Sequence, residues 1–196
     1  HWEVKPIRYH GDLVTGITPP TDDETNYSDS GWPWLRPDDL DESGKPSTAS
    51  KFLTGRGWDY CRAVPPNSTL ICCIASIGKI GYVEETVSTN QQITAFVPKR
   101  SHSYAFYATQ AAKAEMEAAT AGNVVGILNN ERLADIVLPL PPENEACDIS
   151  NWVEGQSHKI DLLSKEAQGS ISLLKERRSA LISAAVTGKI DVRGWQ

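Results

Sequence analysis

Residues 138–188 read LPLPPENEACDISNWVEGQSHKIDLLSKEAQGSISLLKERRSALISAAVTG, and this stretch decides how the chain is organised. After Pro142 no proline interrupts it, and apolar residues recur at seven-residue intervals, the spacing of a coiled-coil helix. Gly155 and Gly169 each weaken such a helix by about 1 kcal/mol, so we expect it to need a partner. Continued to about Gly188, it would be roughly 70 Å long at ~1.5 Å per residue. The positions expected to face the partner helix are Val153, Ile160, Leu163, Ala167, Leu174 and Leu181.

The part before this helix has the pattern of a β-rich domain. Short apolar runs bounded by Gly and Pro predict strands, and a stretch rich in Ala, Lys, Glu and Gln predicts a helix. Strands are predicted at 70–74 and 92–97, a turn followed by a return strand at 76–83, and helices at 104–119 and 130–136. The expected fold class is α+β, with a mixed β-rich domain over residues 1–141 and a long C-terminal coiled-coil helix over residues 142–196.

The composition is that of one folded domain plus an extended element. The chain has 196 residues, of which 40% are hydrophobic and 22% charged. The longest apolar runs fall far short of the roughly 20 residues that span a bilayer, so no membrane segment is expected. No basic stretch followed by an apolar one opens the chain. A cytoplasmic location is the expectation.

Cysteine and histidine spacing argues against a metal centre. The four cysteines show no Cys-x-x-Cys spacing, and the four histidines lie far apart. We expect reduced, mostly buried cysteines, with Cys72 and Cys73 on opposite faces of one strand. The sequence also lacks a Gly-rich phosphate loop and a Gly-x-Ser-x-Gly nucleophile turn. No catalytic residue is therefore predicted.

The net charge of −6 does not favour nucleic-acid binding, but the charges are unevenly distributed. Acidic residues concentrate at 22–24, 38–42 and 143–148, whereas seven basic residues fall between positions 45 and 100. A local basic face is compatible with this distribution. The central basic residues are Lys45, Lys51, Arg56, Arg62, Lys79, Lys99 and Arg100.

Several polar residues in predicted turns have the chemistry to contact DNA, and each has a structural alternative. Arg36 can reach guanine or phosphate, while the flanking Trp32 and Trp34 are expected to anchor its loop on the core. Lys79 in a glycine turn can meet a phosphate or simply be solvated. Residues 90–92, Asn90, Gln91 and Gln92, can pair with adenine or complete local backbone hydrogen bonds. Lys99 and Arg100 follow a strand, where charges often only face solvent.

The end of the chain, LKERRSALISAAVTGKID over residues 174–191, closely resembles the conserved helical region of type I restriction-modification specificity subunits. Other segments resemble that family's target-recognition landmarks and follow in the same order. They are Thr15-Gly16 with Thr18-Pro19, Pro33-Trp34 to Leu40, ASIGK at 75–79, NQQI at 90–93 and LPLPP at 138–142.

The resemblance implies that residues 1–141 form a target-recognition domain that reads one half of a split double-stranded DNA site. The resemblance adds two candidate DNA contacts, Thr18 and Ser76, which lie in two of the landmark segments. The helix would dock modification (methyltransferase) subunits, and the restriction subunit through them, and would pair with a second half-subunit or a second copy of itself. S-adenosylmethionine and ATP are expected on the partner subunits, with no cofactor on this chain. The chain departs from the family in length, since one recognition domain and one helical region are visible where the usual subunit has two of each.

Two other classes of function remain open. The first is a coiled-coil adaptor whose globular part binds protein, which suits the acidic balance and predicts no salt-sensitive DNA binding. The second is a recognition module separated from a fused methyltransferase-nuclease, which predicts a longer parent gene.

Overall fold

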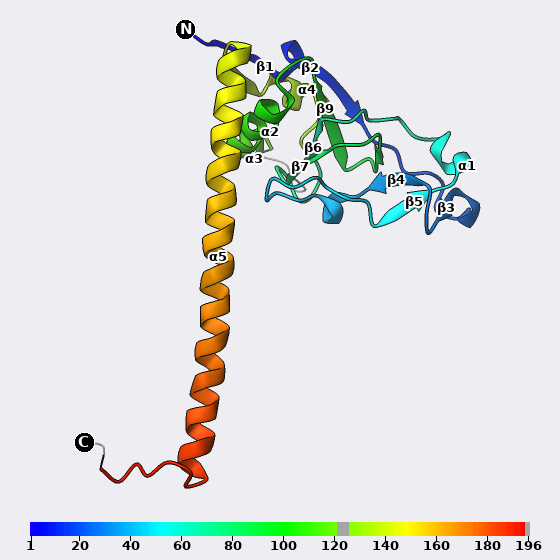
Figure 1. Cartoon of the computed structure of the whole chain (residues 1–196). Helices are drawn as coiled ribbons and strands as arrows, with labels where there is room; N and C mark the ends of the chain where they lie inside the picture. Colours follow the sequence, from blue (N-terminus) through cyan, green and yellow to red (C-terminus); the bar gives the residue numbers. More distant parts are fainter. Residues whose placement is uncertain (121–125, 195–196) are drawn as a thin grey trace. The chain divides into compact units, whose positions relative to one another are not determined.

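The computed structural model describes residues 1–120 and 126–194. It divides into two compact units, His1–Ser150 and Asn151–Gln196. The first unit holds every strand and all helices but the last (Figure 1). Its strands are β1 Glu3–Pro6, β2 Gly11–Thr15, β3 Tyr27–Ser28, β4 Trp32–Leu35, β5 Lys51–Leu53, β6 Ser68–Cys72, β7 Ile80–Val83, β8 Ser88–Thr89, β9 Ile93–Pro98 and β10 Val137–Leu140. Its helices are η1 Ile7–Tyr9, η2 Glu24–Asn26, η3 Pro37–Asp39, α1 Gly55–Trp58, α2 His102–Ala111, α3 Lys113–Ala118 and α4 Asn130–Asp135.

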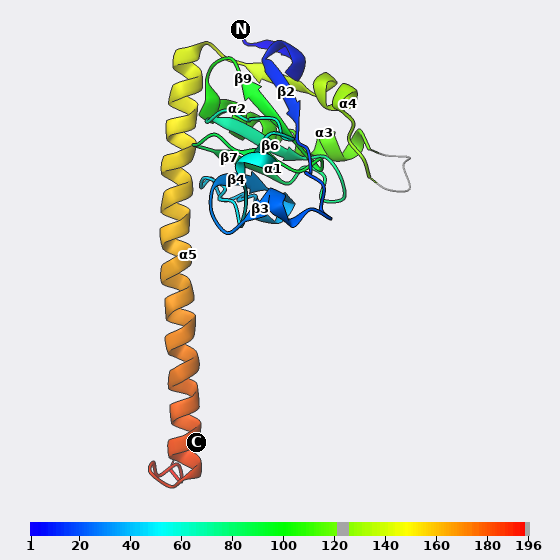
Figure 2. The same ribbon diagram turned by 90° about the vertical axis from the view of Figure 1, so that its right-hand side faces the viewer.

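Two four-stranded sheets and a two-stranded ribbon organise the first unit. The first sheet has the order β2-β9-β6-β7 and is antiparallel throughout. The second sheet has the order β3-β5-β4-β8, in which β4 and β8 are parallel. β1 and β10 pair as an antiparallel ribbon. Figures 1 and 2 show α2 and α3 on one side of the first sheet and the second sheet on its other side.

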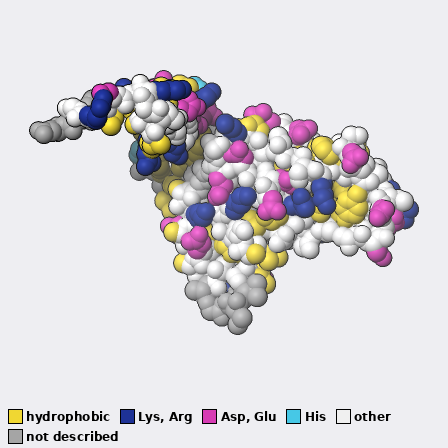
Figure 3. Space-filling model, turned by 90° about the horizontal axis from the view of Figure 1, so that it is seen from below, with side chains coloured by type: hydrophobic (Ala, Val, Ile, Leu, Met, Phe, Trp, Pro, Cys, Tyr) yellow, Lys and Arg dark blue, Asp and Glu magenta, His cyan; other side chains and the backbone are white. Residues whose placement is uncertain are grey.

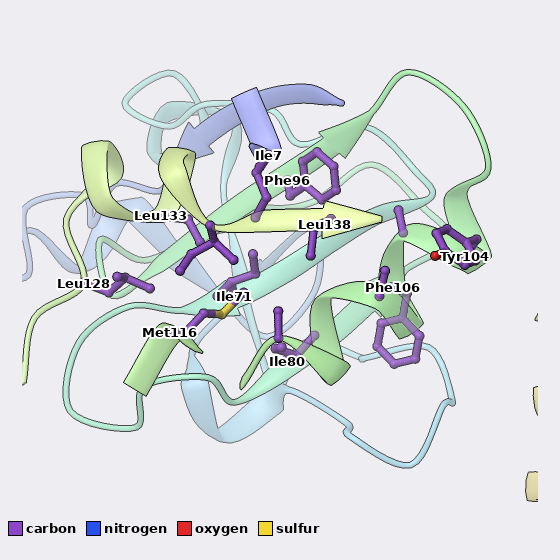
Figure 4. Packing of buried hydrophobic residues seen from close by; sticks show 14 of the residues in the cluster. Ile7, Ile71, Ile80, Phe96, Tyr104, Phe106, Met116, Leu128, Leu133 and Leu138 are labelled. Carbon is purple, nitrogen blue, oxygen red and sulfur yellow. The ribbon is translucent and has the colours of Figure 1, made fainter. Parts of the chain in front are cut away.

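Because the first sheet is covered on both faces, its central strands are apolar at successive positions. In β6, Ile71 packs into a cluster with α2, α3, α4 and β10, whereas Leu70 packs toward the second sheet. Figure 4 shows the first cluster, with Met116 near Ile71 and Phe96 near Ile7. The predicted buried strand at 70–74 is confirmed as β6, which begins and ends two residues earlier. The return strand predicted within 76–83 is β7, and the strand predicted at 92–97 is β9.

Cys72 and Cys73 occupy opposite faces, as expected. Cys72 belongs to the cluster beneath the second sheet, and Cys73 to the cluster beneath the helices. The expectation that the cysteines are mostly buried holds for this pair only, since Cys61 is half-buried and Cys147 is exposed. All four are reduced thiols.

The C-terminal helix α5 runs without interruption over Glu143–Val186, as predicted. Its first turns belong to the first unit, where Ala146 and Ser150 are buried. The helix ends where Gly188 adopts φ +70°. Gly188 N donates to Ala185 O (3.2 Å) and Lys189 N to Ala184 O (2.8 Å). This paired arrangement closes a helix at a left-handed glycine, so the position of Gly188 sets the helix length.

Three local expectations differ from the structure. The predicted helix 104–119 is divided at Ala112, whose N–H is shared between Ala108 O and Thr109 O in a tightened turn. Residues of the proline-rich segment before α5 form strand β10 instead of only a helix start. Trp32 is exposed instead of anchoring its loop, because it begins β4 outside the core. No helix in the described ranges has the length and hydropathy needed to span a bilayer.

Candidate nucleic-acid interface

Two loops that are distant in sequence meet at the end of β2. Gly16 N donates to Ile93 O (3.0 Å), and Ile17 N donates to Thr89 O (2.9 Å). A Cβ at position 16 would lie 2.2 Å from Thr89 Oγ1 and 2.3 Å from Asn90 O. Only glycine permits this approach. The Thr-Gly pair noted in the sequence therefore fastens the two loops that carry Thr18 and residues 90–92.

The polar side chains of these loops bond to one another. Thr18 Oγ1 donates to Gln91 Oε1. Asn90 Nδ2 donates to Gln92 Oε1 (2.8 Å), and Gln92 N donates to Asn90 Oδ1 (3.1 Å). Asn90 is buried, so its amide braces the loop, whereas Gln91 is exposed. The bond from Thr18 fixes the orientation of the exposed Gln91 amide, which keeps two N–H donors and a second oxygen lone pair for a ligand.

Arg36 lies directly beside these loops. Asn90 N donates to Leu35 O (3.0 Å), the residue before Arg36. The Arg36 guanidinium is half-buried, donates from Nη2 to Ser50 Oγ (3.1 Å) and lies 4.0 Å from the Asp39 carboxylate. Asp39 also accepts from Arg36 N (2.8 Å). These contacts restrict the guanidinium at the edge of the second sheet.

Ser76 and Lys79 lie on the turn between β6 and β7. Ser76 is exposed, whereas Lys79 is half-buried and its Nζ donates to Pro37 O (2.7 Å). The bond ties this turn to η3, next to Arg36. Lys79 is thus not simply solvated, and a phosphate contact would require its ammonium to leave Pro37.

Most of the candidate DNA contacts from the sequence are therefore linked around the meeting point of the two sheets. The linked residues are Thr18, Arg36, Ser76, Lys79, Asn90, Gln91 and Gln92. Lys99 and Arg100 are separated from them by the whole of β9, a distance of about 23 Å at ~3.3 Å per residue. Both are exposed and line a cavity of about 200 Å³ together with His10, Tyr104 and Leu138.

The structure adds an aromatic pair that sequence reasoning missed. Trp32 stacks on Trp58 of α1, with ring centroids 4.6 Å apart and ring planes inclined by 21°. Arg56 on the same helix forms an ion pair with Asp23 (2.9 Å). The two indoles lie on different elements, so no local sequence pattern signals their contact. The two indoles form an aromatic corner beside the second sheet.

Basic and acidic side chains are mixed on the surface of the first unit. Figure 3 shows Lys and Arg side chains in a row across one face of the first unit, with Asp and Glu side chains among them.

Burial raises the pKa of the Cys61 thiol and of the Tyr27 hydroxyl. Tyr27 OH donates to Pro19 O (2.9 Å) and so holds the loop after Thr18 as a neutral group. Among the described residues, no three His, Cys, Asp or Glu side chains group to hold a metal ion.

The predicted seam of α5 is open to solvent along most of its length. Ile160, Leu163, Leu174 and Leu181 are exposed, and Val153 is half-buried. Ala167 is exposed too. A helix face with this many exposed large apolar side chains is typical of a protein interface.

The sequence matches known proteins over nearly its whole length. The family described as "Type I restriction modification DNA specificity domain" matches residues 1–181. The type I restriction enzyme HindI specificity subunit of Haemophilus influenzae is 23% identical over 96% of this chain and 42% of its own length. The MjaIX specificity subunit of Methanocaldococcus jannaschii is 24% identical over 85% of this chain and 42% of its own length. The chain thus spans less than half the length of these relatives.

Solved structures of the same kind share the fold. A chain from work on complex assembly and conformational transition of the type I R-M system aligns with a TM-score of 0.79 at 17% identity, covering 94% of this chain and 45% of that one. The HsdS subunit from Thermoanaerobacter tengcongensis aligns with a TM-score of 0.70 at 19% identity, over 96% of this chain and 45% of that one. Since the family match extends over residues 1–181, the chain belongs to the type I restriction modification DNA specificity domain family.

Proposed function

We propose that the first unit reads one half of a bipartite double-stranded DNA target for a type I restriction-modification complex. The observation that carries this proposal is membership of the DNA specificity domain family over residues 1–181. The linked polar residues around Gly16 support it, because side chains on loops that a rigid scaffold positions are suited to reading base edges.

Different residues of the interface have different proposed roles. The exposed Gln91 amide and the restricted Arg36 guanidinium are the groups proposed to reach base edges. Ser76 is a proposed phosphate contact, whereas Thr18, whose hydroxyl donates to Gln91, holds the loops in place together with Asn90, Gln92 and Lys79. Lys99 and Arg100 are proposed to meet the phosphate backbone about 23 Å away, which corresponds to roughly seven base pairs at ~3.4 Å each.

The chain is proposed to direct chemistry that other subunits perform. S-adenosylmethionine and the methylation of adenine would belong to the modification subunits, and ATP with DNA cleavage to the restriction subunit. Helix α5 is proposed to dock the modification subunits. Leu162 and Leu173 support this role because both are exposed leucines outside the predicted seam, eleven residues apart and so on one side of the helix.

The test is methylation of a random DNA library by this chain purified together with its modification subunit. A sequence-dependent set of modified adenines is expected only when the chain is present. Gln91→Ala should relax recognition at one base position by about 5- to 150-fold, the equivalent of ~1–3 kcal/mol for a bidentate contact. Gln168→Ala is the matched control, since Gln168 is an exposed glutamine on α5, and it should leave the motif unchanged.

Other outcomes point to other functions. A stable complex that methylates without sequence preference would keep the docking role and contradict DNA reading. A chain that neither binds the modification subunit nor shows salt-sensitive DNA binding would favour the coiled-coil adaptor.

A further inference from the structure

The three amide side chains at residues 90–92 are not equally available to a ligand. Asn90 is buried, and its Nδ2 donates to Gln92 Oε1 (2.8 Å). Asn90 Oδ1 in turn accepts from Gln92 N (3.1 Å), so this pair is used within the loop. Gln91 is exposed, and Thr18 Oγ1 donates to its Oε1. These contacts select Gln91 as the amide that can reach a base edge.

The bond from Thr18 also decides which atoms Gln91 presents. A free amide can turn over and exchange its oxygen and nitrogen, but a hydroxyl that donates to Oε1 keeps the oxygen on the side of Thr18. Nε2 then offers its N–H donors beside the second lone pair of Oε1. This order matches the major-groove edge of adenine, which has an acceptor at N7 and a donor at N6. Guanine has two acceptors there, so its O6 would face Oε1.

Arg36 presents donors only. Its guanidinium is held by the bond from Nη2 to Ser50 Oγ (3.1 Å). Its Nε is buried and has no acceptor within the described residues, since the Asp39 carboxylate lies 4.0 Å away, beyond hydrogen-bond distance. The group is therefore fixed in place while its charge and further donors remain for a ligand. A fork of N–H donors matches guanine, whose N7 and O6 both accept.

Strand pairing places these two groups side by side. β4 and β8 are parallel with Leu35 opposite Thr89, and Asn90 N donates to Leu35 O (3.0 Å). One residue further, Arg36 lies beside Asn90, which directly precedes Gln91. Neighbouring strands are about 4.8 Å apart, and base pairs follow one another at ~3.4 Å. The separation corresponds to roughly one or two base-pair steps.

We infer that the half-site contains an A·T pair read by Gln91 and a G·C pair read by Arg36, either adjacent or with one base pair between them. Thr18 is the positioning residue that sets the preference for adenine. The inference rests on the proposed function, since it names the bases that the same site reads.

Gln91→Glu tests the adenine assignment by an exchange of specificity. The glutamate presents acceptors only, so adenine should be replaced by cytosine, whose N4 is a donor, at one position of the motif obtained from the random library. The guanine position should not change. Gln168→Glu is the matched control, because it adds the same charge at an exposed glutamine of α5, and it should leave both positions unchanged.

A motif that is identical with and without Gln91→Glu would overturn the assignment. If the added charge abolishes methylation, Gln91→Ala decides instead. Relaxed preference at one adenine near the guanine position would then support the inference, and an unchanged motif would overturn it.

Two substitutions of Thr18 separate positioning from a structural role. Thr18→Val removes the donor at nearly constant size and should lower the preference for adenine by about 2- to 13-fold, the equivalent of ~0.5–1.5 kcal/mol for one hydrogen bond. Thr18→Ser keeps a hydroxyl and should retain the preference. The guanine position should be unaffected in both variants. Equal loss at the adenine and guanine positions in Thr18→Val would show a structural role and overturn the assignment of Thr18.

Arg36→Gln tests the guanine assignment and the spacing. Only the guanine position should lose its preference, and it should lie within two base pairs of the position that Gln91→Glu changes. Thermal denaturation and co-purification with the modification subunit show that the variant is folded. Loss of preference at a more distant position, or at none, in a folded variant would overturn the inference.

The library experiment also separates this inference from the proposed function. Methylation without sequence preference by the unsubstituted chain would contradict DNA reading itself. A defined motif that responds to neither Gln91 nor Arg36 would keep DNA reading and overturn the inference.

Discussion

Gly16 holds the two loops of the candidate interface together, and its substitution tests that role. A Cβ there would meet Thr89 Oγ1 and Asn90 O at 2.2 and 2.3 Å, so Gly16→Ala forces the backbone apart. We expect the free energy of unfolding to fall by about 1–3 kcal/mol, the usual cost of overpacking, measured by urea titration. Gly155→Ala is the control, because nothing lies within 4 Å of its Cβ position. Equal stability of Gly16→Ala and the unsubstituted chain would contradict the proposed fastening of the loops.

The cysteines should differ sharply in reactivity. Burial raises the pKa of the Cys73 thiol to about 11, so at pH 8 only about 0.1% of it is thiolate. Cys147 is exposed. We expect a thiol reagent at pH 8 to modify Cys147 first and to reach Cys73 only on unfolding, because raising the pH toward 11 is needed to form its thiolate. Fast modification that persists in Cys147→Ser would contradict this assignment.

At the scale of elements, α5 differs from the helices of the first unit because most of its length has little tertiary packing. Residues from Ile160 to Ser183 are exposed, so little tertiary packing supports this stretch. A helix in this situation has only its propensities and its ends to rely on. Two features limit the stability of α5. They are the interior glycines and the closing turn at Gly188.

Gly169→Ala should therefore strengthen α5 measurably. The position has open space around it and lies outside the predicted seam, so alanine adds no clash. We expect a gain of about 1 kcal/mol in local helix stability, seen as slower amide hydrogen exchange at residues 160–183. Gly188→Ala is the opposing comparison, because φ +70° disfavours alanine, and it should fray the last turn. Unchanged exchange in Gly169→Ala would show that α5 is already fixed by a partner.

At the scale of the whole molecule, the net charge of −6 opposes DNA binding, whereas the exposed Lys99 and Arg100 would favour it. A single recognition unit without partner subunits offers few of the contacts of a complete assembly. We expect the isolated chain to bind duplex DNA with a dissociation constant on the order of 10⁻⁴–10⁻⁶ M, weakening as salt rises. Fluorescence anisotropy at roughly 50 and 200 mM salt measures the dissociation constant and its dependence on salt. Nanomolar affinity without partners, or binding that ignores salt, would contradict it.

The sequence by itself determined the features that depend on neighbours along the chain. The apolar run at β6 and the seven-residue spacing of α5 follow from side-chain period, and the helix end follows from Gly188. The opposite faces of Cys72 and Cys73 follow from the same alternation. These signals are local, so they survive without knowledge of the fold.

Only the tertiary structure decided which candidate residues form one site. Thr18 contacts Gln91 and Lys79 contacts Pro37 because the pairing of β2 with β9 and the stacking of two sheets bring distant loops together. The same pairing places Lys99 at the other end of β9, away from those loops. Contacts between residues so far apart in sequence depend on strand order and register, which residue types alone do not fix. The sequence therefore identified the candidate residues, and strand pairing determined which of them lie together.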